Sequence, residues 1–168
     1  MSNFEQINQL DSRILISNWN YALCRRMRSE GMRLALRSLV GLRNDTQRGT
    51  ILLVDDNVDV RAMAKVFLEH AGYSVATAAD GNEGLRYYEQ HRSSVLLLLT
   101  DVMMPNMNGL ELVDRFLGID SRLPVVFMSG DPWGAHRGLE CIAKPFLPTE
   151  LLEGVKRTLS SSGKKATA

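Results

Sequence analysis

Cysteine is scarce in this sequence of 168 residues, because only Cys24 and Cys141 are present. Neither belongs to a CxxC or a Cys/His spacing, which argues against a disulfide scaffold and against a zinc site. Two isolated cysteines in apolar surroundings are typical of a reducing compartment. We therefore expect a cytoplasmic protein.

Long apolar runs are also missing. The run at 95–99 has the length of a strand and is far too short to span a bilayer. The first residues are polar and acidic instead of a basic flank before an apolar stretch, so a secretory signal is not indicated. With 45% hydrophobic and 23% charged residues, the composition is that of an ordinary globular protein.

Lysine and histidine are absent from residues 1–48, which hold eight arginines and four acids, a charge of +8 − 4 = +4. Residues 49–168 hold twelve basic and fifteen acidic residues, a charge of 12 − 15 = −3. Apolar residues recur at loosely helical spacing up to residue 43, and the stretch after it is typical of a linker. We expect a basic helical extension and linker (1–48), one domain (49–160) and a disordered tail (161–168).

Three roles remain open for the basic extension. It could be a helix packed on the domain or on a second copy, a dimerising or partner-docking helix, or a segment that binds nucleic acid or lipid. The third role is the least favoured. Because the extension contains no histidine, a phosphodonating histidine helix is excluded.

From Thr50 onward, short apolar runs alternate with amphipathic stretches. We expect strands at 51–54, 73–78, 95–99, 124–128 and 141–143, and helices at 60–70, 83–91, 109–117 and 148–159. The strands are almost wholly apolar, as in strands that are buried on both faces. The pattern predicts an α/β fold with a doubly wound, five-stranded parallel sheet and helices on both sides.

Polar residues follow four of the expected strands. Asp55 and Asp56 follow the first strand, Asp101 the third, Ser129 the fourth and Lys144 the fifth. In such sheets, chemistry gathers at the carboxyl ends of the strands, so these side chains are expected to meet. Two carboxylates about 4 Å apart repel each other by about 4 kcal/mol near a protein surface. A hard cation such as Mg²⁺ relieves that repulsion and also clamps phosphoryl oxygens, and a carboxylate is a competent phosphoryl acceptor.

Four motifs occur in this order at the strand ends and resemble the receiver domain of two-component response regulators. They are Ile51-Leu-Leu-Val-Asp-Asp-Asn57, Asp101-Val-Met-Met-Pro-Asn-Met-Asn-Gly109, Met128-Ser-Gly130 and Lys144-Pro-Phe146. Each motif alone is weak, but the set is specific, and the resemblance covers about Thr50–Leu159. It implies a flavodoxin-like receiver fold of the single-domain or hybrid-kinase-associated type.

The resemblance also implies roles for the acids. Asp101 would accept a phosphoryl group from a histidine kinase or a phosphotransfer protein. Asp56 and Asp101 would be direct Mg²⁺ ligands, Asp55 would help through water, and the backbone carbonyl of Met103 would be the third protein ligand.

Two further residues receive roles from the resemblance. Ser129 would follow the phosphoryl group and Lys144 would pair with it. The Lys144–Pro145 peptide bond would be cis.

Two features depart from the family pattern. Cys141 stands where the family usually has an aromatic residue that rotates with the serine or threonine, so signal relay through that ring is in doubt. The stretch 130–143 is short by about two helical turns and rich in glycine. We therefore expect the fourth helix to be shortened or missing and the usual output face to be unused.

The leading hypothesis is a Mg²⁺-dependent phosphoacceptor module, with output through protein–protein contacts and without enzymatic activity beyond self-phosphorylation and slow self-dephosphorylation. Only nine residues follow Leu159, so we expect no output domain after it. An alternative is a phosphorylation-independent interaction module that acts through its basic N-terminal helix, including as a homodimer. A phosphohydrolase with an aspartate nucleophile is disfavoured, because Met103 stands where such enzymes carry a second acid.

Overall fold

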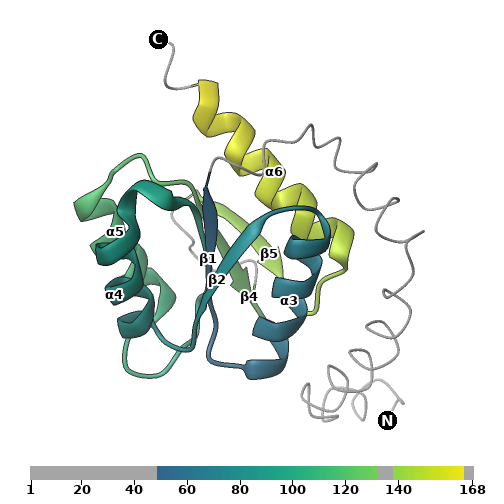
Figure 1. Ribbon diagram of the computed structural model, residues 1–168. Coiled ribbons are helices and arrows are strands. Elements are labelled where there is room, and N and C mark those ends of the chain that lie inside the picture. Colours follow the sequence, from purple (N-terminus) through teal and green to yellow (C-terminus); the bar gives the residue numbers. More distant parts are fainter. Residues whose placement is uncertain (1–48, 132–137, 165–168) are drawn as a thin grey trace.

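The computed structural model describes residues 49–131 and 138–164 (Figure 1). The predicted basic extension (1–48) and the last residues of the predicted tail (165–168) lie outside the described residues. In the part of the chain that is described, no helix is long and apolar enough to cross a membrane.

Strands and helices alternate along the described chain, as the sequence predicts. The elements are β1 (Thr50–Val54), α3 (Val58–His70), β2 (Ser74–Ala78), α4 (Gly81–His91), the 3-10 turn η2 (Arg92–Ser94), β3 (Val95–Asp101), α5 (Gly109–Ile119), β4 (Val125–Ser129), β5 (Glu140–Ala143) and α6 (Pro148–Lys164). The five strands pair in the order β2-β1-β3-β4-β5, and every pairing is parallel. The predicted doubly wound, five-stranded parallel sheet is confirmed.

The sheet is the middle of three layers, with α3 and α6 on one face and α4 and α5 on the other (Figure 1). Side chains of β1 alternate between the two faces. Ile51 and Leu53 pack in the core under α3 and α6, whereas Leu52 and Val54 pack under α4 and α5. All four are fully buried, which explains why this strand is apolar at every position.

Two helices begin earlier than predicted. The side chain of Asn57 accepts hydrogen bonds from the N–H groups of Asp59 and Val60, so α3 begins at Val58 instead of residue 60. Asp80 caps α4 in the same way by accepting from the Glu83 N–H group. These caps satisfy backbone donors that apolar periodicity does not reveal.

Helix α6 ends later than predicted, at Lys164 instead of residue 159. The hydroxyl of Ser161 donates to the carbonyl oxygens of Arg157 and Thr158, and that of Ser162 donates to the Thr158 oxygen. Serine hydroxyls bound to the preceding turn are compatible with a continuing helix. The expected disordered tail is therefore corrected at residues 161–164, which are helical.

The connection from β4 to β5 comprises residues 130–139. Its described residues, 130–131 and 138–139, are not helical. The prediction of a shortened or missing fourth helix otherwise falls on 132–137, which lie outside the described residues.

Candidate functional site

Three carboxylates meet at the carboxyl edge of the sheet. Asp55 and Asp56 directly follow β1, and Asp101 is the last residue of the neighbouring strand β3. Each residue places one carboxylate oxygen within 4.8 Å of the others. Asp55 is 0% exposed and Asp101 is 7% exposed, whereas Asp56 is exposed to solvent. The structure thus brings the predicted acids together.

The ammonium group of Lys144 joins two of these acids. Lys144 Nζ lies 2.7 Å from Asp55 Oδ2 and 2.8 Å from Asp101 Oδ2. The lysine reaches the acids from the loop after β5, and its backbone N–H donates to the Ser129 carbonyl oxygen at 2.7 Å. The Lys144–Pro145 bond is cis, as the resemblance implied. One cation shared by two buried carboxylates offsets much of their mutual repulsion.

Ser129 reaches the same edge, at the end of β4, and is only 3% exposed. Its hydroxyl donates to the Asp131 carbonyl oxygen and accepts from the Asp131 N–H group, both at 3.0 Å. Because a hydroxyl has one proton to donate, Ser129 has to give up its bond to the Asp131 carbonyl oxygen before it can donate to a group attached to Asp101. Its predicted role toward a phosphoryl group stays a prediction.

The backbone N–H group of Met103 lies close to the Asp101 carboxylate. The distance from this nitrogen to Asp101 Oδ1 is 3.4 Å, while Met103 as a whole is 76% exposed. The two other methionines of this loop, Met104 and Met107, are buried. The ligand role that we predict for the Met103 carbonyl remains a prediction.

Burial raises the pKa of the Asp55 carboxyl above its ordinary value, because the charged form loses its hydration. The Lys144 ammonium opposes this rise through its charge and hydrogen bond, and the Asn57 N–H group opposes it more weakly. The negative charge of Asp101 adds to the rise. Keeping the buried Asp55 carboxylate ionised thus costs free energy, and a bound cation would reduce that cost.

This raised pKa leads to a prediction about stability. The folded, metal-free protein binds the Asp55 proton more tightly than the unfolded chain. The resulting stability is therefore complete below the unfolded pKa near 3.8 and is lost as the pH rises through the folded value. Asp55→Asn removes the buried charge, so it should raise the melting temperature at pH about 7, and the gain should shrink as the solution is acidified.

Circular dichroism melts of the metal-free protein across this pH range test the prediction. Asp56→Asn is the matched control. Because the Asp56 carboxylate is exposed and keeps its hydration, its replacement should change the melting temperature less. A loss of stability in Asp55→Asn at every pH would contradict the prediction.

One residue of the motifs has a structural role that the sequence analysis did not assign. The Gly109 N–H group donates to the Val102 carbonyl oxygen at 2.9 Å. A Cβ atom at Gly109 would overlap the carbonyl oxygen of Asp101. This glycine therefore lets α5 begin directly against the backbone of the central acid. The only signal in the sequence is the glycine at the end of the second motif.

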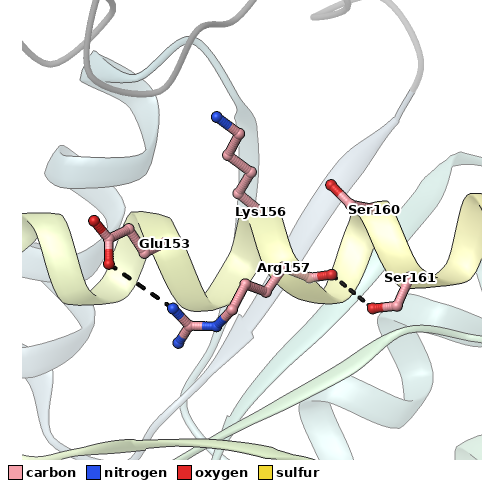
Figure 2. A pocket seen from close by; sticks show the side chains of 5 residues that line it. All are labelled: Glu153, Lys156, Arg157, Ser160 and Ser161. Carbon is pink, nitrogen blue, oxygen red and sulfur yellow. Dashed lines mark hydrogen bonds and ion pairs between the residues drawn. The ribbon is translucent and has the colours of Figure 1, made fainter.

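A shallow hollow lies along α6, as Figure 2 shows; it is lined by Glu153, Lys156, Arg157, Ser160 and Ser161. The Arg157 guanidinium is paired with Glu153 at 3.8 Å and with Glu140 of β5 at 2.6 Å. None of these residues belongs to the acidic cluster. The hollow is thus separate from the site that the sequence predicts.

The chain matches a known family over most of the described region. Residues 51–156 match the response regulator receiver domain. The chain belongs to the response regulator receiver family. This result confirms the resemblance drawn from the four motifs, and the fold described above is that of a receiver domain.

Relatives of this receiver domain include longer regulators. It is 36% identical over 122 residues to the DNA-binding response regulator MtrA of Mycobacterium tuberculosis, and the match covers 68% of this chain and 52% of that protein. It is 33% identical to the transcriptional regulatory protein YkoG of Bacillus subtilis, over 71% of this chain and 54% of that protein. The chain thus spans about half the length of the curated relatives it matches.

Solved receiver structures are similar over most of their own length. The receiver domain of the hybrid histidine kinase CckA is 37% identical, with a TM-score of 0.59, over 66% of this chain and 99% of that one. The chemotaxis protein CheY4 of Vibrio cholerae is 32% identical, with a TM-score of 0.56, over 66% of this chain and 98% of that one. Both comparisons agree with the parallel sheet described here.

Proposed function

We propose that the chain is a signalling module that accepts a phosphoryl group on Asp101 from a histidine kinase or a phosphotransfer protein, in a reaction that needs Mg²⁺. The observation that carries this proposal is the position of the Lys144 ammonium. It lies within 2.8 Å of both Asp55 and Asp101, in a cluster of three acids. A nucleophilic carboxylate beside fixed positive charge is the arrangement that phosphoryl transfer requires.

The donor set fits Mg²⁺. Three carboxylates offer oxygen ligands within 4.8 Å of one another, and Mg²⁺ prefers such hard oxygen ligands. We assign Asp55, Asp56, Asp101 and the Met103 carbonyl to this ion. When bound, the ion supplies charge neutralisation to phosphoryl oxygens. Asp56 is exposed to solvent, so an ion can reach at least one of the assigned ligands directly.

The protein's own groups perform the remaining steps. A carboxylate oxygen of Asp101 forms the new bond to phosphorus, the P–N bond of a phosphohistidine breaks, and its electron pair stays on the imidazole nitrogen. Lys144, already 2.8 Å from Asp101, is placed to pair with the oxygens of the transferred group. The Ser129 hydroxyl, once its proton is released from the Asp131 carbonyl oxygen, becomes a donor to the same group.

The surface around the acids supports a protein as the phosphodonor. Three large apolar side chains are exposed to solvent here: Val58 is 63% exposed, Met103 76% and Leu147 44%. Each lies within three residues of Asp56, Asp101 or Lys144 in the sequence. Exposed apolar side chains close to a polar site are typical of protein–protein contact. We propose that output also proceeds through protein contacts in the cytoplasm. DNA binding is a property given for the relative MtrA, and we do not transfer it to this chain.

The test is the intact mass of the full chain after incubation with acetyl phosphate. We expect the mass of one added phosphoryl group with Mg²⁺ and no addition when the ion is chelated. No added mass, together with failure to bind a beryllium fluoride mimic of the phosphoryl group, would refute the phosphoacceptor function. The phosphorylation-independent module would then be the better hypothesis.

A further inference from the structure

We propose that Arg61 of α3 is a positioning residue that holds the Asp56 carboxylate in place for Mg²⁺. The inference rests on the proposed function, because it concerns the same acidic site. It starts from the backbone of the loop that joins β1 to α3. That loop carries two of the three acids.

Asp55 lies just beyond the last residue of β1, so its carbonyl oxygen is outside the strand. The residue is fully buried, and a buried carbonyl oxygen without a partner is costly. Arg61 supplies the partner, since its Nη1 atom donates to the Asp55 carbonyl oxygen. The Asp55 N–H group donates to the Ala78 oxygen at 3.2 Å, and the Asn57 N–H group donates to Asp55 Oδ1 at 2.9 Å.

The same arginine also holds the other side of the loop. Its backbone N–H group donates to the Asn57 carbonyl oxygen at 3.0 Å. The carbonyl groups of Asp55 and Asn57, the two neighbours of Asp56, are thus both bound to Arg61, one through its side chain and one through its main chain. The Asp55 carbonyl belongs to the peptide unit that contains the Asp56 nitrogen, so the Arg61 side chain fixes the backbone directly before Asp56. The main-chain bond of Arg61 fixes the peptide unit that follows Asn57.

Asp56 depends on such support. Its carboxylate is exposed and, within the described residues, has no hydrogen bond or ion pair of its own. Asp55 and Asp101, in contrast, are both held by Lys144. The ion pairs of the described part of the chain do not include Arg61, so its charge does not compete for a carboxylate that the ion needs. Contacts that orient metal ligands from behind commonly control metal affinity.

The experiment compares Arg61→Met with Lys65→Met in the full chain by calorimetric titration with Mg²⁺ alone. Lys65 is a cation on the same helix, but it pairs with Glu69 at 3.7 Å and, within the described residues, makes no hydrogen bond or ion pair with the loop. We expect Arg61→Met to weaken Mg²⁺ binding about tenfold, Arg61→Lys to recover part of that loss, and Lys65→Met to leave it unchanged. At saturating Mg²⁺, labelling of Arg61→Met by acetyl phosphate should reach the wild-type rate.

The outcomes separate this inference from the proposed function. Wild-type Mg²⁺ affinity in Arg61→Met, an equal loss in Lys65→Met, or a lower melting temperature without a change in affinity would each overturn the role of Arg61 while the phosphoacceptor function stands. If Arg61→Met does not fold, the Arg61→Lys titration decides, and unchanged affinity there overturns the inference. A wild-type chain that binds no Mg²⁺ would refute both.

Discussion

Asp101→Asn is expected to abolish phosphoryl incorporation while leaving the fold intact. The amide keeps the size of the carboxylate, and Lys144 still has Asp55 as its partner at 2.7 Å. What is lost is the nucleophilic oxygen, because an amide oxygen does not form a stable bond to phosphorus under these conditions. Intact mass after incubation with acetyl phosphate and Mg²⁺ should show only the unmodified chain.

The matched control for this prediction is Asp59→Asn. Asp59 is an exposed acid in the first turn of α3, close in sequence to the site but outside the acidic cluster. The Asp59→Asn variant should incorporate as much phosphoryl group as the wild type does. Phosphoryl incorporation in Asp101→Asn equal to that in the wild type would place the acceptor elsewhere in the chain.

Lys144→Met is expected to slow labelling by acetyl phosphate about 10²–10³-fold, the usual effect of removing one donor that stabilises a transition state. Methionine retains much of the side-chain volume but removes the charge that lies 2.7 Å from Asp55 and 2.8 Å from Asp101. The phosphoryl oxygens would then lack their protein cation. The rate of labelling at saturating Mg²⁺ is the measurement.

Two comparisons sharpen the interpretation of Lys144→Met. The substitution Lys144→Arg keeps the positive charge, so this variant should retain more activity than the methionine variant. Mg²⁺ binding, measured directly, should persist in Lys144→Met because all assigned oxygen ligands remain. A rate within a factor of about two of the wild type would show that Lys144 serves only to pair the resting acids.

Much of the site follows from local sequence. Apolar runs and helical periodicity are local properties, and they place Asp55, Asp56, Asp101 and Lys144 at strand ends before any contact is known. Parallel pairing then brings those ends to one edge. For this reason the sheet and the gathering of the acids could be predicted, and the family match confirms the fold.

Other features depend on contacts that periodicity does not report. The early start of α3 comes from the side chain of Asn57, and the long α6 from serine hydroxyls near its end. The turn that holds the Ser129 hydroxyl is made by the backbone of Asp131. The role of Arg61 needs the spatial position of a carbonyl oxygen. Each is a bond between groups whose orientation is set only in the folded chain.

The absence of a side chain at Gly109 also makes the link between the acid and α5 stiff. Most neighbouring segments in a protein are separated by side chains, which can change rotamer and absorb a small displacement. Here backbone meets backbone, because the first residue of α5 lies against the Asp101 carbonyl with no room for one extra carbon. A displacement of the Asp101 main chain is therefore expected to displace the first turn of α5 in the same direction.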